Sequence, residues 1–249
     1  MRAETLHVEG RRVRCWRDGV GPPLVLLHGG MADAAFHWSR IWDRLAGRFD
    51  VIAPDLPGFG ESQGLPRSTI PDLIVWLDRL IAVADRGAVG LVGNAFGADL
   101  ARGYAASHPL NCQALVLING GALPSLADRA RAALPLGDGP ANAGAASRAR
   151  SMVADHALLT SDFVAACQGS VAINAIMRQA TRGPAPRRAP TTHTLVLWGE
   201  EDQVAPPAVG LRLAAQLPNA AFRLIPGVGR LPPVEAPDET ADALFAFLG

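Results

Sequence analysis

The stretch that decides the fold reads Val89-Gly90-Leu91-Val92-Gly93-Asn94-Ala95-Phe96-Gly97. Its first four residues form a short apolar run without alternation, which is typical of a strand buried on both faces of a parallel sheet. The closely spaced glycines that follow predict a tight turn. We expect a helix from this turn to about His108, so that the stretch forms a strand, a turn and a helix, the repeating unit of an α/β protein.

Strand and helix patterns alternate on both sides of this unit. The other expected strands are a hairpin within 5–17 and buried runs at 24–27, 51–53, 114–118, 194–197 and 221–225. The other expected helices are 38–45, 70–84, 207–216 and 238–247. This order predicts an α/β fold with a mostly parallel, twisted sheet flanked by helices. In such a sheet the ligand site lies at the carboxyl ends of the strands.

The alternation stops between residues 122 and 189. The composition there becomes rich in Ala and Arg, with helical stretches expected near 126–133 and 162–179. We therefore expect a core domain made of residues 1–121 and 190–249, with 122–189 inserted as a helical cap over the site. Apolar side chains of the insertion, among them Phe163 and Met177, are expected to line the pocket.

Composition excludes several classes of chemistry. All 23 basic residues among the 249 are arginines, a bias typical of GC-rich bacterial coding. Without lysine the chain cannot form a Schiff base or supply a phosphate-binding P-loop lysine. Cys15, Cys112 and Cys167 lie far apart, without the spacing of a zinc site or a disulfide framework. We expect no metal and no cofactor.

Charge and hydropathy point to a small-molecule ligand. The formal net charge is zero and no basic cluster is visible, which argues against nucleic acid or an anionic membrane as the partner. The N-terminus has no apolar leader, and no apolar run is long enough to span a bilayer. We expect a cytoplasmic protein that acts on a small molecule. A homodimer is left open.

Five segments together resemble the α/β-hydrolase superfamily, and the resemblance covers essentially the whole chain. They are LVLLHGG at 24–30, DLPGFGES at 55–62, GNAFG at 93–97, LWGEED at 197–202 and GRLPPVE at 229–235. Within the superfamily, GNAFG and LLTSDF at 158–163 are most similar to the meta-cleavage-product carbon–carbon hydrolases. The resemblance implies an α/β-hydrolase fold with a cap.

The resemblance also implies the positions of a catalytic triad. The family's serine nucleophile stands on a G-x-S-x-G elbow, where this chain has Ala95. The family's histidine base stands where this chain has Arg230, and only the acid, Asp202, matches. A methyl group cannot attack a carbonyl, and a guanidinium cannot act as an ordinary general base.

The rest of the family's site does not depend on these side chains. Backbone N–H groups of Gly30, Met31 and Phe96 are expected to form the oxyanion hole. His28 and Gly29 match the loop that shapes the oxyanion hole, and His28 is expected to have a structural role there. We expect His37 to lie at the start of a helix. The alternative is that its side chain reaches the mouth of the pocket.

Three readings of the function follow. The first is a non-hydrolytic enzyme, such as a lyase, isomerase or cyclase, that holds a carbonyl or carboxylate compound at the oxyanion hole. The second is a pseudoenzyme that binds a small molecule or a partner through the old pocket. If Arg230 and Asp202 only lock each other in a structural salt bridge, the site is instead an inert relic. The third is an ester or carbon–carbon hydrolase inactivated by substitution at Ala95.

Overall fold

The computed structural model describes residues 1–121, 141–168, 171–180 and 188–249. Among these residues, eight strands form one sheet in the order β1-β2-β4-β3-β5-β6-β7-β8. The pairs β1–β2 and β2–β4 are antiparallel, and all the others are parallel. The expected fold class, a mostly parallel sheet flanked by helices, is confirmed.

The element bounds agree closely with the alternation in the sequence. The strands are β1 (Arg2–Val8), β2 (Arg11–Asp18), β3 (Pro23–Leu27), β4 (Asp50–Pro54), β5 (Val89–Asn94), β6 (Cys112–Ile118), β7 (Thr194–Gly199) and β8 (Ala220–Ile225). The helices flanking the sheet are α1 (Ala34–Trp38), α2 (Trp42–Ala46), α3 (Ile70–Val83), α4 (Phe96–Ser107), α9 (Pro207–Gln216), α10 (Pro232–Glu235) and α11 (Pro237–Leu248).

The sheet is covered on both faces, which explains why its central strands are apolar without alternation. Val25 and Leu27 of β3 pack with α3, α4 and α9 in one buried cluster. Leu24 and Leu26 of the same strand pack on the other face with α1, α2 and α11. Successive side chains of a strand point to opposite faces, so each central strand needs apolar residues at every position.

One expected helix, 38–45, is wrong in its extent. The chain forms two short helices there, α1 and α2, and α1 begins earlier because Asp33 accepts a hydrogen bond from Phe36 N at 2.8 Å as its N-cap. Both helices still place Trp38, Trp42 and Leu45 in the same buried cluster. The apolar spacing therefore identified the buried face correctly but not the break between the helices.

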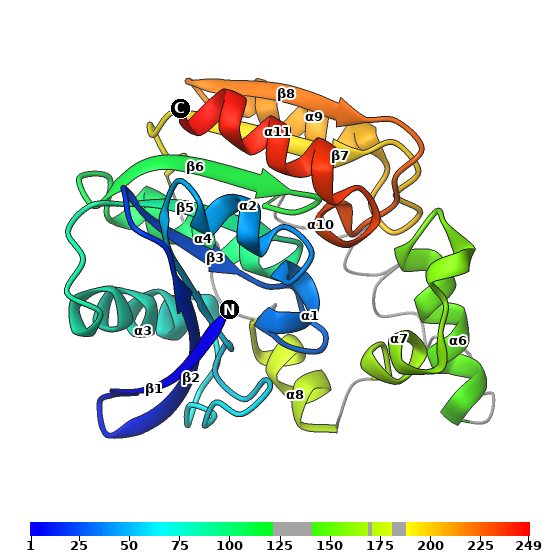
Figure 1. Cartoon of the computed structure of the whole chain (residues 1–249), viewed down its shortest axis with the longest axis horizontal. Helices are drawn as coiled ribbons and strands as arrows, with labels where there is room; N and C mark the ends of the chain where they lie inside the picture. Colours follow the sequence, from blue (N-terminus) through cyan, green and yellow to red (C-terminus); the bar gives the residue numbers. More distant parts are fainter. Residues whose placement is uncertain (122–140, 169–170, 181–187) are drawn as a thin grey trace.

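Between residues 122 and 189 the structure describes three helices, α6 (Ala141–Met152), α7 (Ser161–Ala166) and α8 (Val171–Ala180), and the short 3-10 helix His156–Leu158. The helical stretch expected near 162–179 is divided between α7 and α8, and α7 ends before Cys167, its C-cap. The helix expected near 126–133 lies outside the described residues. Figure 1 shows α6 and α7 on the side toward which the parallel strands point, and α8 below α1. No helix in the described ranges is long and apolar enough to cross a membrane.

Candidate active site

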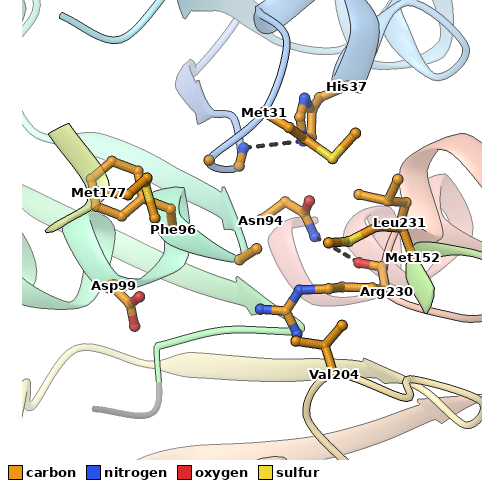
Figure 2. A pocket seen from close by; sticks show the side chains of 13 residues that line it. Met31, His37, Asn94, Phe96, Asp99, Met152, Met177, Val204, Arg230 and Leu231 are labelled. Atoms are coloured by element: carbon orange, nitrogen blue, oxygen red, sulfur yellow. Dashed lines mark hydrogen bonds between the residues drawn. The ribbon is translucent and has the colours of Figure 1, made fainter. Parts of the chain in front are cut away.

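A cavity of about 240 Å³ lies beyond the carboxyl ends of β3 and β5 (Figure 2). The residues that line it are Gly29, Gly30, Met31, His37, Asn94, Ala95, Phe96, Asp99, Met152, Met177, Val204, Arg230 and Leu231. Most of these side chains are apolar, and a few polar groups converge among them. A concave, mainly apolar site with few polar groups is the usual form of a small-molecule site.

Ala95 stands on the sharp turn between β5 and α4. Its backbone has φ 49° and ψ −110°, a conformation that L-residues rarely adopt. The turn also needs glycine on both sides: a Cβ at Gly93 would lie 2.3 Å from the carbonyl oxygen of Gly97, and one at Gly97 would lie 2.1 Å from that of Leu27. The turn therefore presents residue 95 to the cavity, and that residue carries only a methyl group.

Backbone N–H groups border the cavity on two sides. Helix α4 begins at Phe96, and the N–H groups of its first turn lie at the positive end of the helix dipole. The N–H groups of Ala98 and Asp99 donate to the carbonyl of Ala95, whereas those of Phe96 and Gly97 precede the first hydrogen bonds of the helix. Gly30 and Met31 lie opposite, in the loop after β3. The N–H of Gly29 in this loop is already engaged, because it donates to Nε2 of His37 at 3.2 Å.

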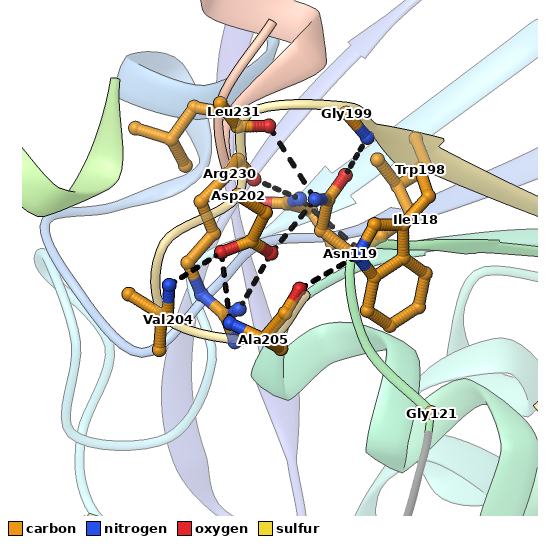
Figure 3. A network of polar contacts seen from close by, with 12 residues as sticks. Ile118, Asn119, Gly121, Trp198, Gly199, Asp202, Val204, Ala205, Arg230 and Leu231 are labelled. Carbon is orange, nitrogen blue, oxygen red and sulfur yellow. Dashed lines mark hydrogen bonds and ion pairs between the residues drawn. The ribbon is translucent and has the colours of Figure 1, made fainter. Parts of the chain in front are cut away.

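Asp202 is held by four donors (Figure 3). Its Oδ1 accepts hydrogen bonds from the N–H groups of Val204 at 2.9 Å and Ala205 at 3.0 Å. Its Oδ2 accepts from Nδ2 of Asn119 at 2.8 Å and from Nη1 of Arg230 at 3.0 Å. Each carboxylate oxygen of Asp202 therefore accepts two hydrogen bonds. Arg230 makes one hydrogen bond with Asp202 rather than the two of a bidentate pair.

The turn that carries Arg230 is fixed by its backbone. Its N–H donates to the carbonyl of Met152, at the end of α6, at 2.8 Å. The carboxylate of Glu235 accepts from the N–H groups of Gly229 at 3.0 Å, Leu231 at 3.1 Å and Ala154 at 2.7 Å. The Glu235 carboxylate thus joins the turn that carries Arg230 to the segment that follows α6. Residues of the turn and of α6 line the cavity.

The two histidines of the site are buried and neutral. Burial lowers the pKa of His37 to about 4 and that of His28 to about 3. His37 lies in the cavity wall, where Nδ1 donates to the carbonyl of Asp33 and Nε2 accepts from Gly29. His28 lies behind the wall and not in it: its Nε2 accepts from the N–H of Leu56 at 2.9 Å.

Of the two residues between 122 and 189 that were expected in the pocket, one lines it and the other does not. Met177 of α8 lines the cavity, and a Cβ added to Gly30 would lie 2.8 Å from its sulfur, so the glycine allows the two segments to approach. Phe163 of α7 is not part of the lining. It packs instead beside Met31 in a small apolar cluster beneath the cavity wall.

Two polar residues of the cavity were missed by the sequence reasoning. Asn94 is fully buried, and its Nδ2 donates to the carbonyls of Ile118 at 3.2 Å and Arg230 at 3.3 Å. Its Oδ1 has no hydrogen-bond partner among the described residues. Asp99, one turn into α4, also lines the cavity. Its position four residues after Ala95, in the first turn of α4, is the signal that could have identified it.

No three His, Cys, Asp or Glu side chains come together as a metal site in the part of the chain that the structure describes. The polar groups of the cavity are instead an arginine, an aspartate, an asparagine, a histidine and backbone N–H groups. This donor set suits an organic ligand with an anionic or carbonyl oxygen.

Comparison with known proteins agrees with this geometry. Residues 22–237 match the model of the alpha/beta hydrolase fold family. The chain is 29% identical to a 2-hydroxymuconate semialdehyde hydrolase of Pseudomonas sp. (strain CF600), over 96% of this chain and 91% of that protein.

Solved structures with the same fold include a bacterial membrane phospholipase A, at 25% identity and a TM-score of 0.88, over 99% of this chain and 85% of that one. Another is the meta-cleavage product hydrolase of Pseudomonas fluorescens IP01, solved as a serine-to-alanine mutant complexed with acetates. It is 20% identical with a TM-score of 0.83, over 98% of this chain and 97% of that one. The chain belongs to the α/β-hydrolase fold family and lies near its meta-cleavage product hydrolases.

Proposed function

We propose that this member of the α/β-hydrolase family is an enzyme that does not hydrolyse. It binds a small carbonyl or carboxylate compound in the cavity beside Ala95 and promotes a lyase, isomerase or cyclisation step without a covalent intermediate. The observation that carries the proposal is the pairing of Ala95 on an intact elbow with Arg230 in the position expected for the base, both facing a retained cavity.

The elbow supports the absence of an acyl-enzyme step. The strained backbone at residue 95 is kept, although the side chain that it presents has no nucleophilic atom. No other histidine of the cavity replaces the base: His37 is its one histidine among the described residues, and its Nε2 already accepts from Gly29. A hydrolytic mechanism of the family's kind therefore lacks both the serine nucleophile and the histidine base of the triad.

Arg230 supports binding of an anion. One of its guanidinium N–H groups donates to Asp202, and the side chain also lines the cavity. A guanidinium has five N–H donors in a fixed plane, so one bond to Asp202 leaves others for a ligand carboxylate or enolate. The nearby start of α4 adds backbone N–H groups and a favourable dipole for negative charge.

We also propose that residues 122–189 form a cap over this cavity. Met152 and Met177, from α6 and α8, line it, and Arg230 N–H donates to the carbonyl of Met152. These contacts give the insertion a direct part in shaping the ligand site. Its apolar side chains would exclude water from the bound compound, which strengthens the electrostatic contacts within the site.

The first test is for hydrolysis. We expect no labelling by a fluorophosphonate serine probe and no burst of p-nitrophenol from p-nitrophenyl acetate, because residue 95 offers no hydroxyl. Intact-protein mass spectrometry and stopped-flow absorbance measure the two outcomes. Stoichiometric labelling at any serine would overturn the proposal.

The second test asks whether the cavity still fits an ester. The double variant Ala95→Ser with Arg230→His restores both missing groups, and circular dichroism checks that it folds. We expect it to remain without esterase activity, since the cavity is shaped for another reaction. Recovered esterase activity would favour the third reading, a hydrolase inactivated by substitution.

A binding protein without activity is the second candidate, and the Arg230–Asp202 ion pair favours it. In that case the guanidinium neutralises the buried Asp202 carboxylate and holds the ligand, without a part in any reaction. Calorimetry with 2-oxobutanoate, which has both a carboxylate and a carbonyl, separates the candidates together with an assay of turnover. Binding that is lost in Arg230→Leu, but without any turnover in the wild type, would support the binding protein.

A further inference from the structure

We propose that Asp99 is the proton-transferring residue of this cavity, which takes a proton from a carbon next to the carbonyl of the bound compound and returns it. The inference rests on the proposed function and names the group that would perform its chemistry. No other carboxylate among the described residues lines the cavity. The triad positions do not include it.

The position of Asp99 follows from the elbow. It lies four residues after Ala95, in the first turn of α4, and both residues line the cavity. Figure 2 shows the Asp99 carboxylate and the Arg230 guanidinium on neighbouring parts of the cavity wall. A compound held by Arg230 and by the N–H of Phe96 would therefore lie within reach of Asp99.

A backbone hydrogen bond orients the Asp99 carboxylate through one of its two oxygens. Its Oδ1 accepts a hydrogen bond from the N–H of Gly121 at 3.1 Å. Arg102, one turn further along α4, donates to the carbonyl of the same glycine at 2.8 Å. Asp99 thus has one oxygen bound to a backbone N–H, and it is not joined to Arg102 by a hydrogen bond within the described residues.

The burial of Asp99, partly opposed by nearby positive charges, suits a base that works near neutral pH. Burial raises the pKa of Asp99 to about 7, against the opposing effects of the Arg230 charge, the Gly121 N–H and the Arg102 charge. His37, the other titratable side chain of the cavity wall, is neutral at this pH. A base with a pKa near the working pH combines availability with driving force for proton transfer.

The proposed step conserves atoms and charge. The Asp99 carboxylate removes a proton from the carbon next to the carbonyl, so the C–H bond breaks and an O–H bond forms on Asp99. The electron pair moves to the carbonyl oxygen, and the resulting enolate is stabilised by Arg230 and the N–H of Phe96. Return of the proton to the same carbon gives exchange, and its return to another carbon gives an isomer.

The test follows exchange of the C3 protons of 2-oxobutanoate in D₂O by proton NMR. We expect the wild type to catalyse exchange above the buffer rate, with a rate that rises with pH and levels off above about pH 7. Asp99→Asn keeps the size of the side chain and an acceptor for Gly121, but it cannot take the proton. A positioned general base contributes about 10²- to 10⁴-fold, so we expect a loss of at least ~100-fold.

Asp43→Asn is the matched control, because Asp43 is an exposed aspartate on α2 outside the cavity lining. It should exchange like the wild type, and both variants are checked for folding by circular dichroism. The pH profile of the wild type is a second measurement that needs no variant.

Each outcome separates the inference from the proposed function. Exchange at the wild-type rate in Asp99→Asn, or a wild-type rate that does not change between pH 5 and 8, would overturn the part assigned to Asp99 and leave the function standing. Binding of 2-oxobutanoate without exchange would overturn it as well, and would favour the binding protein. A wild type that neither binds nor exchanges the compound would overturn both.

Discussion

At the scale of single residues, the cavity combines three features that each cost folding free energy. Ala95 has a strained backbone, Asn94 Oδ1 is buried without a partner among the described residues, and Asp99 is a carboxyl with a raised pKa. Each of these lowers the stability of the folded chain. Their concentration around one cavity is typical of a functional site, because stability alone would not favour them.

Asp99 makes stability depend on pH in a defined direction. Burial raises its pKa in the folded state, so between about pH 4 and 7 the folded protein keeps a proton that the unfolded chain has lost. Stability therefore falls as pH rises through this window. Asp99→Asn removes that loss. The free energy of unfolding of the variant minus that of the wild type should therefore be larger at pH 8 than at pH 5, by about 2 kcal/mol. Urea unfolding at both pH values measures this, and an equal difference at pH 5 and pH 8 would contradict it.

At the scale of elements, two short segments decide the shape of the site. The turn between β5 and α4 depends on the absence of side chains at Gly93 and Gly97. The turn before α10 depends instead on a side chain, because the Glu235 carboxylate accepts three backbone N–H groups from that turn and from the end of α6. The position of Arg230 in the cavity therefore depends on a residue that does not itself line it.

Glu235→Ala should destabilise the protein by about 2–3 kcal/mol, because it leaves several partly buried N–H groups without their charged acceptor. It should also weaken binding of 2-oxobutanoate, since the Arg230 turn loses its support. Urea unfolding and calorimetry measure the two effects. Glu201→Ala is the control, because Glu201 is exposed and its loss should change stability by less than about 0.5 kcal/mol. Equal effects of the two substitutions would contradict the part assigned to Glu235.

At the scale of the whole molecule, apolar clusters cover both faces of the sheet, and a separate small cluster joins the inserted segment to the core. Cys15 and Cys112 belong to the first of the large clusters, and Cys167 belongs to the small one. A small cluster opens at lower free energy than a core of strands, so the three thiols report on different openings.

Alkylation of the three cysteines should follow this order. Burial raises the pKa of Cys15 and Cys112 to about 12 and that of Cys167 to about 11, so all should react slowly in the folded protein at pH 8. Cys167 should react first, through local opening, and the other two only with global unfolding. Mass spectrometry after timed iodoacetamide treatment measures the order. Simultaneous alkylation of all three would show that core and insertion open as one unit.

Much of the fold could be predicted because it depends on local pattern. Unbroken apolar runs predicted the central strands, since a strand buried on both faces needs apolar residues at every position. The break between α1 and α2 was missed because the apolar spacing is the same for one helix or two. The bounds of α7 and α8 within the helical stretch near 162–179 were not predicted for a similar reason, since spacing alone does not show where a helix ends.

The sequence by itself determined the order of strands and helices, the glycine-framed turn and the residue types at positions 95, 202 and 230. Only the tertiary structure decided what surrounds them. It brought Asp99 into the cavity, left His28 and Phe163 behind its wall, and used four donors to hold Asp202. The physical reason is that pattern along the chain reports which face is buried, whereas burial of a charge and its partners depends on residues that are distant in sequence.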